Sequence, residues 1–204
     1  LAIIKGNIDL SMRDKNLGKK EMFEVLEAIN VEVSHLSAML LDLAILTTEN
    51  QDIQKSVTFQ KIRLDTLIKK TVDRLSVLSK TKNITISINS LPALFIGGEN
   101  KYLEKLFSNL VSNALFYGKE NGTVKINAVL DVEHISITIT DDGLGISKED
   151  IPHIFGRFYR STIAREVNHE GTGLGLAISK WIVEAHHGEI SVQREEELFV
   201  KLRS

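Results

Sequence analysis

Two glycine-rich segments carry the residue types that could bind a flat, charged ligand. In the first, TDDGLGI at 140–146, Asp141 directly follows an alternating apolar segment, so a carboxylate stands at the end of a predicted strand. Such a carboxylate, beside an apolar wall, is suited to accept a hydrogen bond from an exocyclic amine. Gly143 and Gly145 would let the backbone approach a ligand closely. A plain turn with an aspartate cap remains the alternative, because Asp-Gly pairs are common in turns.

The second segment, GTGLGLAI at 171–178, gathers Gly171, Gly173 and Gly175 at the start of a predicted helix. Unpaired backbone N–H groups and the helix dipole favour an anion at such a place, and phosphate is the natural guest. The glycines do not follow a strand with dinucleotide-fold spacing, and the chain has no G-x-x-x-x-G-K-[ST] sequence. The two commonest nucleotide-binding folds are therefore not indicated.

A predicted helix at 99–118 carries Asn109 and Asn113 four residues apart, on one face, with Tyr117 four further on. Because asparagine is mildly unfavourable inside a helix, the pair suggests a polar cavity. A solvated helix face is the alternative.

Between the glycine segments lies a loop at 151–170 in which three aromatic residues alternate with Arg157 and Arg160. Either arginine could meet a terminal phosphate, because guanidinium groups bind phosphate well. The alternative is a loop that aromatic residues anchor, with solvated arginines.

The residues described so far lie in a second predicted domain. Residues 1–50 form a first one, because their apolar residues follow a helical spacing throughout. There the apolar spacing alternates four and three, as in a coiled-coil or four-helix-bundle seam: Met22, Leu26, Ile29, Val33, Leu36, Leu40 and Leu43. A shorter helix at about 1–12 and a polar turn precede it. Since one helical hairpin cannot bury so wide an apolar stripe, we predict a homodimer with a four-helix core.

Residues 51–59 are predicted as a linker and 60–204 as an α/β sandwich, with helices on one face of a mixed, mostly antiparallel sheet. The whole chain is thus predicted to be α+β. Strands are expected at 57–64, 84–89, 93–98, 123–131, 134–141, 189–194 and 198–202, and helices at 65–80 with Asp65 as N-cap, at 99–118 ending at Gly118, and at 173–188.

Composition excludes several classes of protein. The net charge is −2 and the pI about 6.3, which does not favour nucleic acid or an anionic membrane as a partner. No stretch holds eighteen consecutive apolar residues and no signal-peptide pattern opens the chain, so we expect no membrane contact. Cysteine is absent, which excludes a thiolate zinc site and fits a cytoplasmic protein.

Four segments, in order, resemble the sequence boxes of the ATP-binding domain of sensor histidine kinases, in the superfamily shared with gyrase, mismatch-repair ATPases and heat-shock chaperones. They are NLVSNALFY (109–117), DDGLGI (141–146), IFGRFYR (154–160) and GTGLGLAISKWIVEAHHG (171–188). The FGRFYR loop favours the kinase branch. With the helical hairpin, which resembles the dimerisation and phosphoacceptor domain, the resemblance covers almost the whole chain.

The resemblance implies ATP and Mg²⁺ as ligands and a role for each candidate residue. Asn113 would hold Mg²⁺ against the phosphates, with Asn109 one turn before it. Asp141 would accept the adenine amine. The residues implied to line or flank the nucleotide pocket are Gly143, Gly145, Ile146 and Tyr117. Those implied to form the lid, the phosphate-binding turn or a γ-phosphate contact are Gly171, Thr172, Gly173, Leu174, Gly175, Arg157 and Arg160.

The resemblance also implies that the chemistry needs groups outside this chain. Leu1 matches the end of a His-Glu-x-x-x-Pro-Leu motif, so the phosphoacceptor histidine is expected just upstream, and no catalytic residue is expected within the chain. His35 is an alternative acceptor, though leucine and not glutamate follows it. The implied partner is a response-regulator receiver domain. His186 and His187 precede Gly188, where a cation would suit a helix dipole, and receive no catalytic role.

Two departures from the family pattern stand out. Phe116 occupies a position where the family often has lysine, and the last hairpin lacks the usual glycine-rich turn. Two other functions stay open: a gyrase- or chaperone-type ATPase, which would need a water-activating glutamate better placed than Glu104, and a non-catalytic dimerisation module.

Overall fold

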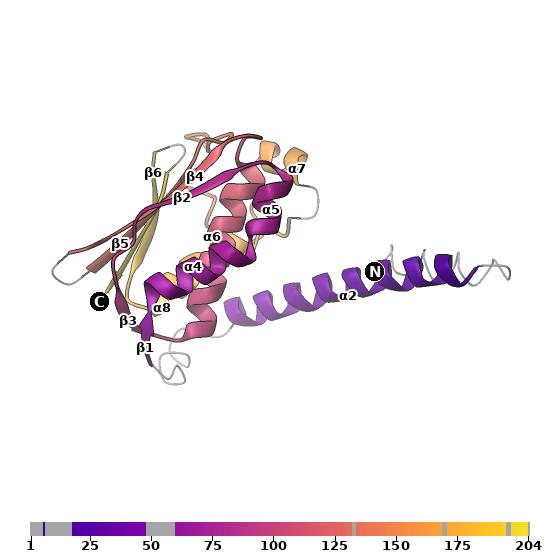
Figure 1. Ribbon diagram of the computed structural model, residues 1–204, viewed down its shortest axis with the longest axis horizontal. Coiled ribbons are helices and arrows are strands. Elements are labelled where there is room, and N and C mark those ends of the chain that lie inside the picture. Colours follow the sequence, from indigo (N-terminus) through magenta and orange to yellow (C-terminus); the bar gives the residue numbers. More distant parts are fainter. Residues whose placement is uncertain are drawn as a thin grey trace. The chain divides into compact units, whose positions relative to one another are not determined.

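The structure is a computed structural model that describes residues 6, 18–47, 60–131, 134–168, 171–194 and 197–203. The chain divides into two compact units, Leu1–Ile45 and Leu46–Ser204. Apart from Gly6, the predicted first helix lies outside the described residues, and so does the predicted linker. The described helices and strands, labelled in Figure 1, are α2 (Lys19–Thr47), β1 (Gln60–Arg63), α4 (Leu64–Arg74), α5 (Ser76–Thr81), β2 (Thr85–Ser90), β3 (Phe95–Gly98), α6 (Asn100–Tyr117), β4 (Thr123–Leu130), β5 (His134–Asp141), α7 (Thr162–Val167), α8 (Gly175–Ala185), β6 (Glu189–Arg194) and β7 (Glu197–Arg203).

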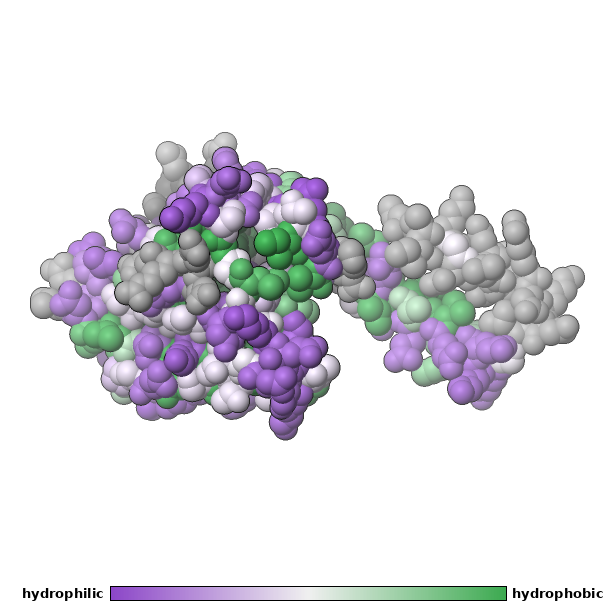
Figure 2. All heavy atoms as spheres, turned by 90° about the horizontal axis from the view of Figure 1, so that it is seen from above, coloured by the Kyte–Doolittle hydropathy of each residue, from purple (hydrophilic) through white to green (hydrophobic). Residues whose placement is uncertain are grey.

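The long helix α2 confirms the helical period of the first unit. Much of its predicted seam is exposed in the single chain, including Met22, Leu26 and Leu40. Figure 2 shows apolar and hydrophilic side chains next to one another on its surface. By length and composition alone α2 could cross a membrane, a test that core helices of soluble proteins also pass.

The second unit contains a five-stranded sheet in the order β2-β4-β5-β7-β6. Among its described strands only the β2–β4 pair is parallel, so the predicted mixed, mostly antiparallel sheet is confirmed. Strands β1 and β3 form a separate antiparallel pair. Helices α4, α6 and α8 lie on one face of the large sheet (Figure 1), as the alternating apolar pattern of the strands requires.

The core lies between that sheet face and the helices. On β5, the buried residues Ile135, Ile137 and Ile139 alternate with half-buried polar ones. Two of their partners on β4 are buried too, Ala128 opposite Ile137 and Ile126 opposite Ile139. Each fully buried aliphatic side chain contributes about 1.5–3 kcal/mol. Helix α6 presents its apolar face to this layer: Leu103, Leu106, Phe107, Leu110, Val111, Ala114 and Leu115.

The prediction of one helix at 65–80, capped by Asp65, is wrong. The chain forms α4 and α5 with a break at Leu75, and Arg63 occupies the N-cap position of α4. Asp65 lies one residue inside the helix, almost fully buried, and accepts a hydrogen bond from Arg63 Nε at 3.2 Å. Burial raises the pKa of the Asp65 carboxyl, but the hydrogen bond and charge of Arg63 outweigh it, and the pKa is lowered.

The interpretation of His186 as a cation at the end of α8 is also wrong. Its ring is buried, and Nδ1 lies 2.7 Å from the carbonyl oxygen of Ile182. Nε2 accepts from the backbone N–H of Glu99 at 3.4 Å, an arrangement that a neutral ring with its proton on Nδ1 satisfies. Burial lowers the pKa of His186, although Ile182 and the charge of Glu99 oppose it.

Candidate functional site

A cavity of about 290 Å³ opens between the carboxyl end of α6, the end of β5 and the loop that leads into α8. All four sequence segments singled out above contribute to its wall, and 154–160 does so through Ile154, Tyr159 and Arg160. The sequence-predicted site residues that line it are Asn113, Tyr117, Asp141, Gly145, Ile146, Arg160, Gly171, Thr172, Gly173 and Gly175. Among the described residues, the wall does not include Asn109, Gly143, Arg157 or Leu174.

Helix α6 supplies one wall, and Gly118 ends the helix as predicted. Gly118 has a negative φ, so its role is close approach: a Cβ there would lie 2.6 Å from the carbonyl oxygen of Ala114. Asn113 and Tyr117 reach the cavity, whereas Asn109 turns to a neighbouring helix and donates from Nδ2 to the Gly175 carbonyl at 3.1 Å. Asn109 thus ties the start of α8 to α6.

The two adjacent carboxylates of the DDGLGI segment have different surroundings. Asp141 is half-buried at the cavity, and its Oδ1 accepts from the N–H of Gly143 at 3.0 Å. Both carboxylate oxygens of Asp142 accept from the N–H of Thr123 at 3.0 Å. Asp142 therefore holds the start of β4 in place, a role that the Asp-Asp pair in the sequence did not indicate.

Gly143 is required by close packing. A Cβ there would lie 2.3 Å from the carbonyl oxygen of Tyr117 and 2.5 Å from Asp141 Oδ1. The next residue, Leu144, donates its N–H to the same Tyr117 carbonyl at 3.2 Å. The end of β5 is thus docked onto the end of α6, and Asp141 is held in a fixed position at the cavity.

The glycine turn, residues 171–175, contributes Gly171, Thr172, Gly173 and Gly175 to the cavity wall. Gly173 has a left-handed backbone, with φ of 70°. The N–H of Leu174 donates to Thr172 Oγ1 at 3.2 Å, and the Leu174 side chain is buried. Helix α8 begins at Gly175, so its first N–H groups lie at this turn, as an anion site requires.

Arg160 joins the glycine turn to the short helix α7, which Ser161 caps by accepting from the N–H of Ala164. Nη2 of Arg160 donates to the carbonyl of Ala164 at 2.6 Å and to that of Asn168. A Cβ on Gly171 would lie 3.2 Å from the guanidinium carbon. A cation is therefore held beside the turn.

The loop before Arg160 contains a hydrogen-bonded group that the sequence analysis missed. The hydroxyl of Tyr159 donates to Asp150 Oδ1 at 2.6 Å, and Ser147 Oγ donates to Asp150 Oδ2 at 2.7 Å. Both bonds lower the pKa of Asp150, and the bond from Tyr159 has the larger effect. The bond to Asp150 raises the pKa of Tyr159. The S-x-x-D spacing at 147–150 was the available local signal.

A cation also reaches the end of α6 from outside the four segments. Lys82 donates to the carbonyl of Phe116, and its Nζ lies 5.9 Å from the centre of the Phe116 ring. Phe116 itself lines the cavity. A positive charge therefore lies close to the position where the resemblance leads one to expect a lysine. No local pattern around residue 82 indicated this.

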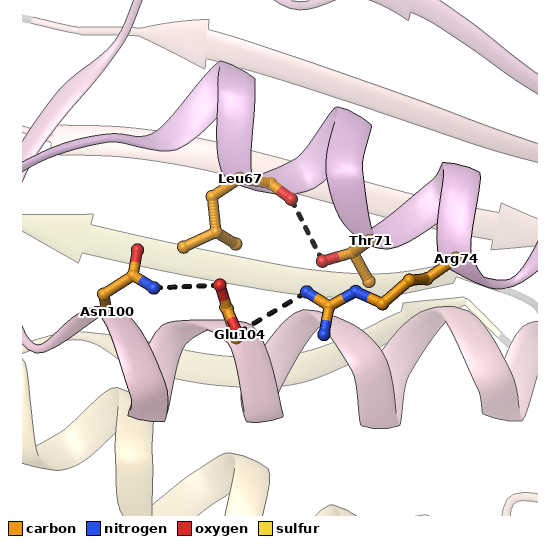
Figure 3. Close-up of polar contacts among 5 residues, drawn as sticks. All are labelled: Leu67, Thr71, Arg74, Asn100 and Glu104. Carbon is orange, nitrogen blue, oxygen red and sulfur yellow. Dashed lines mark hydrogen bonds and ion pairs between the residues drawn. The ribbon is translucent and has the colours of Figure 1, made fainter.

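Glu104, weighed as a water-activating residue, lies elsewhere. It accepts from Asn100 Nδ2 at 2.9 Å and pairs with Arg74 Nη2 at 3.4 Å. Figure 3 shows it on α6 between these two side chains, with Thr71 of α4 bonded to the Leu67 carbonyl nearby. It links α6 to α4 and does not line the cavity.

Comparisons with known proteins find a family model and relatives that match this sequence. The family model for histidine kinase-, DNA gyrase B- and HSP90-like ATPases matches residues 98–203. The signal transduction histidine-protein kinase ArlS of Staphylococcus haemolyticus is 32% identical over 96% of this chain and 43% of its own length. The heme sensor protein HssS of Staphylococcus saprophyticus is 39% identical over 66% of this chain and 28% of its own length. The chain thus spans less than half of either relative.

The fold has solved counterparts as well. The structure of the Acinetobacter baumannii histidine kinase AdeS is similar, with a TM-score of 0.77 at 21% identity, covering 99% of this chain and 93% of that one.

Proposed function

We propose that this chain transfers the γ-phosphoryl group of Mg-ATP to a histidine. It belongs to the histidine kinase-, DNA gyrase B- and HSP90-like ATPase family and carries the catalytic ATP-binding domain of a sensor histidine kinase. The phosphoryl group then passes to an aspartate of a response regulator. Both steps would need groups outside the ATP-binding domain, namely the acceptor histidine and the aspartate of the response regulator.

One observation carries the proposal: Asn113, Asp141 and the glycine turn line a single cavity although they come from three separate segments. In this proposal the carboxylate of Asp141 accepts a hydrogen bond from the adenine amine. Gly145, Ile146 and Tyr117 form the walls around the base. Phosphoryl transfer needs little covalent chemistry from the protein, so holding the base and the phosphates in place is most of its task.

The glycine turn is proposed to hold the phosphates on the first N–H groups of α8. Arg160 lies beside it and is proposed to face the terminal phosphate, whereas Arg157 is exposed and lies off the wall. A guanidinium near the γ-phosphate would stabilise the charge that spreads over its oxygens during transfer. Gly143 and Asn109 take positioning roles, since Gly143 fixes the end of β5 and Asn109 the start of α8.

The charges of the cavity wall fit the need for a metal ion. Among the described lining residues, Asp141, Asp150 and Glu197 are acidic and Arg160 is the basic one. An anionic nucleotide in such a wall needs further positive charge. The described residues contain no group of three acidic, histidine or cysteine side chains that could hold a metal. Mg²⁺ is usually bound by one or two protein oxygens together with substrate phosphates, and the Asn113 amide oxygen suits that arrangement.

The acceptor and partners are proposed as well. We propose that the acceptor histidine lies upstream of Leu1. The side chain of the alternative, His35, lies outside the described residues. The exposed seam of α2 supports a homodimer, because an apolar stripe of that kind needs a second helical surface to cover it. We place the chain in the cytoplasm, where a receiver domain could reach it.

A hydrolytic ATPase is the less supported function. Activating water requires a carboxylate near the phosphates, and Glu104 is engaged by Arg74 and Asn100 away from the cavity. The residues that α6 contributes to the wall are uncharged: Leu110, Ser112, Asn113, Ala114, Phe116 and Tyr117.

Calorimetric titration with ATP, with Mg²⁺ and with a chelator, tests the proposed ligands. Wild-type chain should bind ATP about tenfold or more tightly with Mg²⁺, because a charge-assisted contact is lost without it. Asn113→Ala should remove the difference in affinity between ATP with and without Mg²⁺. Asn127→Ala should keep it, because Asn127 lies on the face of β4 opposite the buried residues and does not line the cavity. Equal binding with and without the metal in the wild-type chain would contradict the Mg²⁺ assignment. Absence of ATP binding would contradict the proposed function itself.

A further inference from the structure

The glycine turn rests on the backbone of the loop before it. A Cβ on Gly173 would lie 2.7 Å from the carbonyl carbon of Phe158 and 2.9 Å from the carbonyl oxygen of Tyr159. Only glycine can approach so closely. The position of Gly173 therefore depends on the backbone at Phe158 and Tyr159.

That supporting backbone is itself in an unfavourable conformation. Phe158 has φ of 61°, in the left-handed region that bulky L-residues rarely adopt. Phe158 is 58% exposed, so burial of its side chain does not hold it there. Such a conformation persists only where the surrounding structure imposes it.

The next residue supplies that constraint. Tyr159 is half-buried, and its hydroxyl donates to Asp150 Oδ1 at 2.6 Å. Asp150 is fixed in turn, because Ser147 Oγ donates to its second oxygen and accepts from its backbone N–H at 3.1 Å. The Tyr159 ring also lies against His153, with the ring centres 5.6 Å apart. Tyr159 is thus fixed at both its ring and its hydroxyl.

We propose that Tyr159 is a positioning residue for the glycine turn: its hydroxyl, anchored on Asp150, holds Phe158 in the left-handed conformation, and that backbone sets the place of Gly173. The consequence for ATP rests on the proposed function, in which the turn holds the phosphates. Loss of the hydroxyl then weakens phosphate binding and leaves the base end of the cavity unchanged, because Asp141 is fixed separately by Gly143.

The first test needs no ligand. Backbone amide NMR spectra of the 204-residue chain are compared between wild type, Tyr159→Phe and the matched control Tyr102→Phe, whose ring packs on Trp181 away from the cavity. Tyr159→Phe should shift or broaden the amide signals of the glycine turn, and it should leave those of Asn113 and Leu144 in place.

Two outcomes of this comparison would overturn the proposal, whether or not the chain binds ATP. The first is a set of glycine-turn signals that do not move in Tyr159→Phe. The second is an equal shift in Tyr102→Phe, because loss of any tyrosine hydroxyl would then disturb the turn.

The second test measures the affinity of the chain for ATP and for adenosine. Adenosine binding is followed by the chemical shifts of the backbone amides. Tyr159→Phe should weaken ATP by about three- to tenfold, the range expected for one hydrogen bond, and adenosine by less than about twofold. An equal loss for both probes would contradict a role confined to the phosphate end. If the wild-type chain bound neither probe, the proposed function would fail, while the NMR comparison would still decide the positioning role.

A rescue variant separates this role from a general loss of stability. Asparagine tolerates the left-handed region better than phenylalanine does. In a Phe158→Asn background the backbone should need the Tyr159 hydroxyl less, so adding Tyr159→Phe should change ATP affinity by less than about twofold. A full-sized effect in that background would show that the hydroxyl acts by another route.

Discussion

The two units of the chain bury their apolar residues in different ways. In the second unit the apolar faces of β5 and α6 are covered by each other and by neighbouring elements of the same unit. In the first, the seam residues Met22, Leu26 and Leu40 of α2 are more than half exposed. The second unit thus buries its own core, and the exposed seam of the first supports our proposal that a second copy of the chain covers it.

Charges placed in the seam should disrupt the helical unit and spare the other. Leu36→Asp with Leu40→Asp puts two charges in the proposed dimer seam, and burying unpaired charge is costly. We expect a monomer by sedimentation. The ATP affinity should stay within about twofold of wild type, because the cavity residues lie in the second unit and should lose no hydrogen bond. Ser34→Asp with Ser37→Asp adds the same charge outside the seam and should leave a dimer. A dimer that survives the seam variant would mean that another surface mediates association.

The pH dependence of stability should report on the second unit, with a smaller effect. Burial lowers the pKa of His186 in the folded state, so the unfolded chain takes up a proton first as the pH falls. Its contribution to stability is therefore complete above the unfolded value of about 6.5 and is lost as the pH falls toward the folded pKa, by up to about 1.4 kcal/mol per pH unit. Thermal unfolding between about pH 8 and 5 should show this loss.

The matched variants are His186→Gln, which cannot take up the proton, and His187→Asn at the exposed neighbour. The first should flatten the loss of stability below a pH of about 6.5, and the second should not. Identical slopes in wild type and His186→Gln would contradict a buried neutral ring.

Glu104 should matter least of these groups. Its pair with Arg74 is partly exposed, and such pairs contribute about 0–1 kcal/mol. Glu104→Gln should therefore lower stability by no more than about 1 kcal/mol and leave ATP binding unchanged. Any ATP turnover by the wild-type chain should also persist in the variant. Loss of turnover in Glu104→Gln would restore the hydrolytic ATPase as a candidate.

Much of the fold could be predicted because its signals are local. The alternation in β5, the seam of α2 and the glycine that ends α6 each lie within one element. Asp65 misled because aspartate is a common N-cap, and only the structure shows it buried and bonded to Arg63. His186 misled because its burial depends on β3 and α6, which are distant in sequence.

The site divides in the same way. Residue types predicted which segments gather at the cavity, and Asn113, Asp141 and Gly173 all line it. Their supports could not be predicted, because the partners are distant: Asp142 holds Thr123, Lys82 reaches Phe116, and Asn109 binds the start of α8. Local sequence gives the kind of group and tertiary packing decides what it touches.

The assignment of Asp141 to the adenine amine is best tested by an ATP titration that compares Asp141→Asn with Asp142→Asn by calorimetry. With one side-chain oxygen taken by the N–H of Gly143, an asparagine at 141 would turn its NH₂ toward the adenine amine, so two donors would meet. We predict that Asp141→Asn weakens ATP by at least about a hundredfold, and that Asp142→Asn changes it by less than about threefold. Unchanged affinity in Asp141→Asn, or an equal loss in both variants, would show that Asp141 does not hold the base.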